Sequence, residues 1–130
     1  MAKSIKQKIS FKVSASTVYD ALMDSKKHSA FTGAGAKISR KVGGAFSAFD
    51  GYATGKNLKL IEDKKIVQSW HASDWEKDQM SEVTFLLSES KSGCTLTFTH
   101  KNVPAKHYSS IKQGWIDFYW KPMKKMFENR

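Results

Sequence analysis

Residues 50–75 constrain the fold of this chain more than any other segment. They predict two strands that reverse direction at a charged turn over residues 62–65, because a short polar turn between two strand-forming runs is typical of an antiparallel hairpin. Trp70 and Trp75 are expected to face an interior. The segment holds no motif of reacting groups. It therefore predicts a protein that encloses or presents an apolar surface.

Further short strands surround this hairpin. Residues 5–13 alternate apolar and polar side chains, as in a strand with one buried and one exposed face. Threonines 95, 97 and 99 alternate with Leu96, Phe98 and His100, so the threonines are expected outside and the other three side chains inside. Tight connections predict antiparallel neighbours. The expected strands cover residues 5–13, 36–39, 45–49, 52–61, 65–72, 81–88 and 95–101.

Two short helices are predicted after the first strand. Ser14 or Ser16 can cap a helix whose apolar residues, including Val18 and Leu22, recur at helical spacing. Residues 26–31 predict a second short helix or turn. Both elements precede the run of strands.

Residues 109–127 predict a long closing helix. Its apolar stripe includes Trp115 and Phe118, and lysines occupy the opposite side. Gly114 is expected to let the helix approach the sheet closely, and Pro122 to bend it, because proline lacks a backbone N–H. The element order predicts an α+β fold in which an antiparallel sheet curls around this helix.

Length and cysteine content indicate one domain in a reducing compartment. The chain has 130 residues, of which 40% are hydrophobic, so residues 1–130 are expected to form a single domain. The single Cys94 cannot form an internal disulfide, and the first ten residues do not resemble a secretory signal. No run approaches the roughly 18 apolar residues of a membrane-spanning helix. We therefore expect a cytoplasmic location.

Charge is the strongest feature of the composition. The chain carries 22 basic and 12 acidic residues, a formal net charge of +10. Arg40 and Arg130 are its two arginines, and the other 20 basic residues are lysines spread along the chain. Arginine is the residue that reads bases and contacts phosphates at two points. A dispersed lysine surface instead favours solubility and weak attraction to polyanions, so specific nucleic-acid recognition is not expected.

Four segments, in this order, resemble the activator of heat shock protein 90 ATPase homologue family. The family belongs to the START-like (Bet v 1-like, SRPBCC) superfamily, and this chain resembles its C-terminal-domain type. The matching segments cover residues 18–60, 64–75, 95–104 and 114–125, and include Gly44, Gly51, Gly55, Trp70, His100, Pro104, Gly114, Trp115 and Trp120.

The resemblance implies a helix-grip fold with a cavity between sheet and helix. It also implies a stress-related protein that binds a small hydrophobic ligand, a heat shock protein 90 type chaperone, or both. We therefore expect a non-catalytic binding domain. The alternative is an enzyme of the polyketide cyclase/dehydratase type, in which His100 with Tyr52 or Tyr119 would move protons.

Catalytic, metal and cofactor sites are not expected from the motifs. The four histidines are dispersed, and no zinc-ligand spacing occurs. Cys94 follows a hairpin turn without an adjoining histidine and is expected to be a half-buried small apolar residue. His100 lies on the inward side of its strand. It is expected to hydrogen-bond a neighbour, and the alternative is proton transfer inside a cavity.

Aromatic side chains are the candidate cavity lining. Each can fill the core or contact a ligand, and the indole N–H and phenol O–H can orient a polar group. The candidates are Phe31, Phe46, Trp70, Phe85, Phe98, His100, Trp115 and Tyr119.

Overall fold

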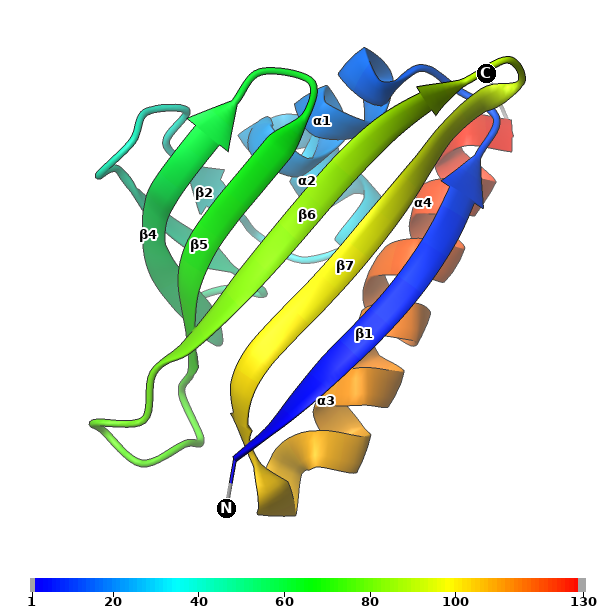
Figure 1. Cartoon of the computed structure of the whole chain (residues 1–130). Coiled ribbons are helices and arrows are strands. Elements are labelled where there is room, and N and C mark those ends of the chain that lie inside the picture. Colours follow the sequence, from blue (N-terminus) through cyan, green and yellow to red (C-terminus); the bar gives the residue numbers. More distant parts are fainter. Residues whose placement is uncertain (1, 129–130) are drawn as a thin grey trace.

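The computed structural model describes residues 2–128; Met1, Asn129 and Arg130 lie outside the described residues. It contains an antiparallel sheet in the order β1-β7-β6-β5-β4-β3-β2, with the helices on one of its faces (Figure 1). The strands are β1 (Ala2–Phe11), β2 (Lys37–Ile38), β3 (Ala45–Ala48), β4 (Ala53–Ile61), β5 (Lys65–Ala72), β6 (Ser81–Ser90) and β7 (Gly93–Pro104). The helices are α1 (Ala15–Met23), α2 (Ser25–Thr32), η1 (Ala105–His107), α3 (Tyr108–Trp115), η2 (Ile116–Trp120) and α4 (Lys121–Glu128).

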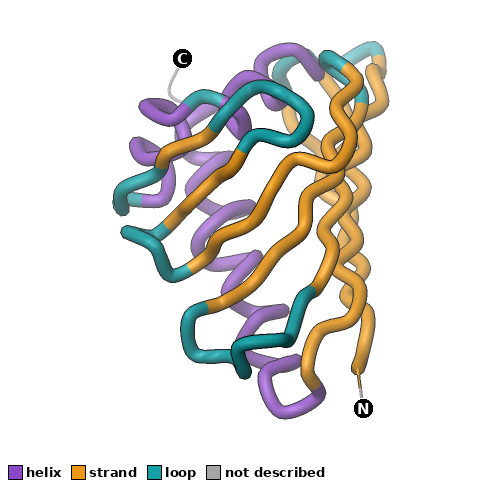
Figure 2. Tube along the Cα trace, turned by 90° about the vertical axis from the view of Figure 1, so that its left-hand side faces the viewer, coloured by secondary structure: helices purple, strands orange, loops and turns teal. Residues whose placement is uncertain are grey.

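The curved sheet wraps around the C-terminal helix, as Figure 2 shows from the side. This arrangement confirms the predicted α+β helix-grip fold. Alternation along each strand divides the side chains between two faces. Ile5, His100 and Val83 lie opposite one another in register across β1, β7 and β6, and all three are buried against the helices. The threonines of β7 face the other way, as predicted.

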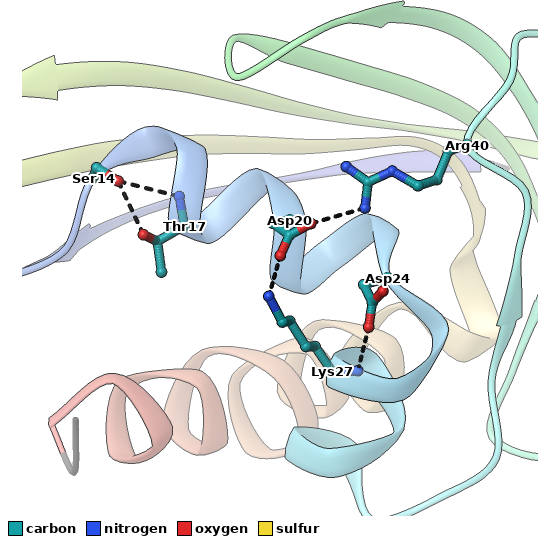
Figure 3. A network of polar contacts seen from close by, with 6 residues as sticks. All are labelled: Ser14, Thr17, Asp20, Asp24, Lys27 and Arg40. Atoms are coloured by element: carbon teal, nitrogen blue, oxygen red, sulfur yellow. Dashed lines mark hydrogen bonds and ion pairs between the residues drawn. The ribbon is translucent and has the colours of Figure 1, made fainter.

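A small polar network fixes α1, α2 and the loop after β2 relative to one another (Figure 3). The Ser14 hydroxyl accepts a hydrogen bond from the Thr17 N–H and caps α1, and the Asp24 carboxylate does the same for α2 at Lys27. Asp20 forms ion pairs with Lys27 and with Arg40, the latter at 2.9 Å. Because these side chains are partly exposed, each pair contributes only about 0–1 kcal/mol.

The closing helix is not a regular α-helix. A π-helical turn, η2, separates α3 from α4, and the Lys121 N–H donates to the Ile116 carbonyl five residues back. Pro122 follows directly and has no N–H, which favours a local departure from α-helical bonding. The wider turn rotates the buried face, so Trp120 is buried beside Tyr119, which the sequence already places inside. Phe118, predicted in the buried stripe, is instead 54% exposed.

Three smaller predictions are wrong. A Cβ atom at Gly114 would meet only the Phe118 ring, at 3.8 Å, so this glycine does not bring the helix close to the sheet. Cys94 is fully buried, not half-buried. The first strand ends at Phe11, and Val13 belongs to the connection to α1. Within residues 2–128, the helices are too short and too polar to cross a membrane.

Candidate functional site

An apolar cavity of about 300 Å³ lies between the closing helix and one end of the sheet. This volume is at the lower end of the range of small-molecule sites. Aromatic rings make up most of the wall, and hydroxyl groups of serine and tyrosine supply polar atoms. The lining residues are Phe49, Tyr52, Trp70, Ser110, Ile111, Gly114, Trp115, Phe118 and Tyr119.

The turn between β3 and β4 forms one wall of the cavity. Phe49 and Asp50 both have positive φ angles, 54° and 55°, which non-glycine residues rarely adopt. The Asp50 carboxylate accepts a hydrogen bond from the Gly35 N–H at 3.0 Å and holds the turn in place. The Phe49 ring thereby meets Phe118 and Tyr119 edge-on, each at 5.8 Å between centroids. Backbone strain of this kind is frequent at functional sites.

Trp70, Trp115 and Tyr119 form the inner wall. The rings of Trp115 and Tyr119 are 4.4 Å apart between centroids, and Trp70 lies 5.9 Å from Trp115. Tyr52, in the loop before β4, contacts Trp70. Burial, together with the nearby Asp74 carboxylate, raises the pKa of Tyr52 to about 12. Its hydroxyl therefore keeps its proton at neutral pH, with the Asp74 carboxylate as a neighbouring acceptor.

Gly114 leaves space in the helix wall of the cavity. Apart from the edge of the Phe118 ring, a Cβ atom at this position would have no close neighbour. Phe118 itself is largely exposed, and a distance of 3.8 Å from its ring to the added Cβ atom is an ordinary van der Waals contact. The cavity can therefore be narrowed by substitution at Gly114 without a clash in the core.

A second, much smaller space lies behind Tyr119. It measures about 10 Å³, and its walls include Tyr119, His28 and Gln68. A single water molecule needs about this volume. His28 is 4% exposed, its Nδ1 atom has no hydrogen-bond partner, and burial lowers its pKa to about 4. Tyr119 lines both spaces, as do Trp70 and Trp115.

His100 lies beneath the cavity in a buried chain of hydrogen bonds that runs from Trp115 to the Trp70 carbonyl. The Trp115 indole N–H donates to His100 Nδ1 at 3.1 Å, which leaves the proton of the neutral ring on Nε2. That N–H donates to the Ser81 hydroxyl at 2.8 Å, and the hydroxyl donates to the Trp70 carbonyl at 2.6 Å. Burial lowers the pKa of His100 to about 3. These contacts confirm the prediction that His100 hydrogen-bonds its neighbours.

The structure divides the predicted lining residues into three groups. Trp70, Trp115 and Tyr119 line the large cavity, and the same three also line the smaller space. Phe46 and Phe85 line the smaller space alone. The remaining three pack beside these walls and line neither space; they are Phe31, Phe98 and His100.

Sequence reasoning missed several lining residues. Phe49 precedes an Asp-Gly pair, a turn signal that marks the segment but not the direction of the ring. The sequence pattern predicts close packing at Gly114 and a core position for Phe118, and neither prediction places these residues at the cavity. The other lining residues outside the predicted set are Ser110 and Ile111 of α3, and Tyr52 of the loop before β4.

The fold and the cavity define a class of protein. A curved antiparallel sheet that grips a C-terminal helix around an apolar cavity is the helix-grip architecture. Within this class, the chain belongs to the family of Activator of Hsp90 ATPase homolog 1-like proteins, whose model matches residues 12–128. The family predicted from the sequence is therefore confirmed.

Individual relatives agree with this assignment. An Activator of 90 kDa heat shock protein ATPase homolog from Dictyostelium discoideum is 30% identical over 87% of this chain and 30% of its own length. Homolog 1 from Homo sapiens is 26% identical over 92% of this chain and 36% of its own length. The chain thus spans about a third of these curated relatives.

Solved structures show the same fold. An HSP90 activator from Plasmodium falciparum superposes with a TM-score of 0.88 at 26% identity, over 95% of this chain and 94% of that chain. The Aha1 dimer from Colwellia psychrerythraea gives a TM-score of 0.83 at 22% identity, over 97% and 96% of the two chains. At that lower identity the second likeness concerns the fold alone.

Proposed function

We propose that this chain is a non-catalytic accessory domain that binds an Hsp90-type chaperone. The observation that carries this proposal is the likeness to the Plasmodium falciparum HSP90 activator, which covers 94% of that chain. A unit of this size therefore corresponds to nearly the whole solved chain of a protein described as an activator. The family match over residues 12–128 supports the same function.

The side chains near the cavity support binding in preference to catalysis. Both ring nitrogens of His100 are engaged in hydrogen bonds, and its low pKa keeps it neutral at physiological pH. The raised pKa of Tyr52 makes its hydroxyl a weak acid, so the phenolate needed for a general base is scarce near neutral pH. These groups are suited to structural hydrogen bonds and to holding a ligand.

The chaperone's steady-state ATPase rate tests the proposal. We expect a slight, saturable rise when the chain is added to the Hsp90-type chaperone of the same organism. The rise is expected to be small because the chain spans only about a third of its curated relatives. A heat-denatured sample of the chain serves as the control. An unchanged rate, together with no detectable binding, would overturn the proposal.

A second function is favoured by the cavity itself. Its aromatic wall and volume of about 300 Å³ are suited to a small hydrophobic molecule with one polar group near Tyr52 or Ser110. This function is compatible with chaperone binding, because the ligand would lie between the sheet and the closing helix and a chaperone would contact the outside of the domain.

Titration with a panel of fatty acids, flavonoids and aromatic polyketides tests the second function. We expect amide shift changes around the lining residues, including Trp115 and Tyr119, and smaller changes on the outer threonines. Changes confined to the outer face, or none with any compound, would contradict it. Turnover of a compound, lost when His100→Gln is introduced, would instead support an enzyme of the polyketide cyclase/dehydratase type.

A further inference from the structure

The face of the sheet opposite the helices is not covered by any helix of residues 2–128; in Figure 1 the helices lie behind it. On this face the strand register aligns side chains into two continuous rows that cross from β1 to β4. The first row is Lys6, Thr99, Thr84, Val67 and Lys59, and the second is Lys8, Thr97, Leu86, Lys65 and Ile61.

Lysines lie toward both ends of these rows, at the β1 edge of the face and at its β4–β5 side. Lys6 and Lys8 lie on β1, while Lys59 and Lys65 lie on β4 and β5. None of the ion pairs found in residues 2–128 includes any of these four. The acidic residue Glu82 of β6 is adjacent to the first row. It is directly opposite Lys101 in the register of β7, so its charge is already matched by a neighbouring lysine.

The centre of the face is apolar and hydroxyl-rich. Leu86 is 46% exposed and lies between Thr97 of β7 and Lys65 of β5, with Thr84 two residues earlier on its own strand. Val67, in the adjoining row, is only 9% exposed and forms a shallow floor between longer side chains. Because threonine and valine are short and branched, this strip lies lower than the lysine side chains at its edges.

The spacing of the lysines matches an α-helix. Lys6 and Lys59 of the first row are four strand intervals apart, about 19 Å at ~4.8 Å for each interval, and Lys8 and Lys65 of the second row are three intervals apart, about 14 Å. A helix with its side chains is about 10–12 Å wide. A helix can therefore lie on the central strip while acidic side chains on its two flanks reach the lysines on either side.

We propose that this outer face is the docking surface for an acidic amphipathic helix of a partner protein. The helix places an apolar stripe on Leu86 and Val67 and directs carboxylates toward the lysines of β1 and of β4–β5. The identity of the partner rests on the proposed function, which assigns it to an Hsp90-type chaperone. The docking surface itself rests on the register and the charges of the sheet.

The chemistry of the face favours a protein over a nucleic acid. The cations in the two rows are all lysines, which do not form the two-point contacts that arginine makes with phosphates and bases. The central strip offers Leu86 and threonines but no aromatic ring on which bases could stack. An exposed leucine between lysines is suited to an apolar side chain flanked by carboxylates.

A designed peptide tests the surface independently of the chaperone. The probe is a synthetic helix with a leucine stripe flanked by glutamates, and the control is the same helix with lysines in place of the glutamates. We expect the acidic helix to shift the amide signals of Thr97, Thr99, Thr84 and Leu86, and the basic helix to shift none. Shifts elsewhere, equal shifts with both helices, or no shift would overturn the proposal.

Charge reversal on two different surfaces separates docking from general attraction. One variant carries Lys6→Glu, Lys8→Glu, Lys59→Glu and Lys65→Glu. The control variant carries Lys26→Glu, Lys106→Glu, Lys124→Glu and Lys125→Glu, which are exposed lysines outside the two rows. Both have the same net charge. We expect the first variant to weaken binding of the acidic helix by about tenfold or more, and the control by less than about threefold.

A third variant tests the apolar centre. Leu86→Gln leaves the charges intact and changes a half-exposed side chain, so the fold is expected to be unaffected and binding to be weaker. Equal losses in the two charge variants, or full binding by all three, would overturn the proposal. A mixed-sequence DNA duplex that binds the face more tightly than the acidic helix would also overturn it.

The chaperone provides the last comparison. If wild type binds the chaperone and the row variant binds equally well, the docking surface is wrong and the proposed function stands. If the acidic helix maps to the face but the chaperone does not bind, the proposed function fails and the docking surface stands. We expect the row variant to lose affinity for both.

Discussion

The indole N–H of Trp115 donates a hydrogen bond to His100 Nδ1 across the boundary between the closing helix and β7. The same imidazole is held from the other side by Ser81. Trp115 also forms part of the cavity wall. One side chain therefore connects the helix, the buried polar chain and the candidate site, so substitutions here affect both stability and binding.

Trp115→Ala is expected to lower the free energy of unfolding by about 3–5 kcal/mol, because it removes a large buried ring. Trp115→Phe keeps much of the packing but leaves His100 Nδ1 without a donor, and is expected to cost about 1–3 kcal/mol. Phe118→Ala, on the exposed side of the same helix, is the matched control. Its cost is expected to be below about 1 kcal/mol.

Denaturant unfolding measures all three variants. If Trp115→Ala unfolds at the same denaturant concentration as wild type, Trp115 does not anchor the helix in the core.

Stability is expected to fall between pH 6.5 and pH 4.5 because of two buried histidines. The folded-state pKa values of His100, about 3, and of His28, about 4, lie below the value of about 6.5 in an unfolded chain. The unfolded state therefore binds more protons in this range, and acid favours unfolding. Each histidine contributes a slope of up to about 1.4 kcal/mol per pH unit.

A variant separates the two contributions. His28→Phe keeps an aromatic ring beside Phe31 and Tyr119, which His28 contacts in the structure. The unfolded state of this variant is expected to bind about one proton fewer in excess of the folded state. The slope of unfolding free energy against pH is therefore expected to fall by up to about 1.4 kcal/mol per pH unit. Chemical unfolding at several pH values gives the slopes directly. An unchanged slope in the variant would show that His28 titrates alike in both states.

Gly114→Leu is expected to close the cavity without harming the fold. Its side chain would extend into the cavity, because a Cβ atom there meets only the Phe118 ring. Loss of a helical glycine is expected to raise stability, by up to about 1 kcal/mol for the control Gly114→Ala. Binding of the tightest compound in the panel is expected to fall at least about tenfold in Gly114→Leu and to change little in Gly114→Ala. Equal binding by the leucine variant would place the ligand elsewhere.

The strands were predictable because their signals are local. β5 was expected over residues 65–72 and is observed as Lys65–Ala72. The inward direction of Trp70 and His100 follows from the period of two, which needs no knowledge of distant residues. The polar ends of these strands and their tight turns made the antiparallel arrangement equally clear.

The closing helix was less predictable because its period is not constant. A helical wheel with 3.6 residues per turn puts Phe118 and Tyr119 near Trp115, but the π-helical turn adds a residue and puts Trp120 on the buried side in place of Phe118. The direction of the Phe49 ring also could not be predicted from the sequence, since it depends on a positive φ angle held by the contact between Asp50 and Gly35. The site therefore differed from the prediction mainly where backbone geometry departs from regular structure.

Calorimetric titration of this chain into the Hsp90-type chaperone of the same organism, at low and at physiological salt, tests the central claim most directly. The basic surface predicts saturable binding at low salt that becomes several-fold weaker at physiological salt, because exposed charges are screened over about 8–10 Å. The row variant with four reversed lysines is predicted to bind more weakly than the control variant at both salt concentrations. Absence of binding at either salt by a folded chain would contradict the proposed role as a chaperone accessory domain.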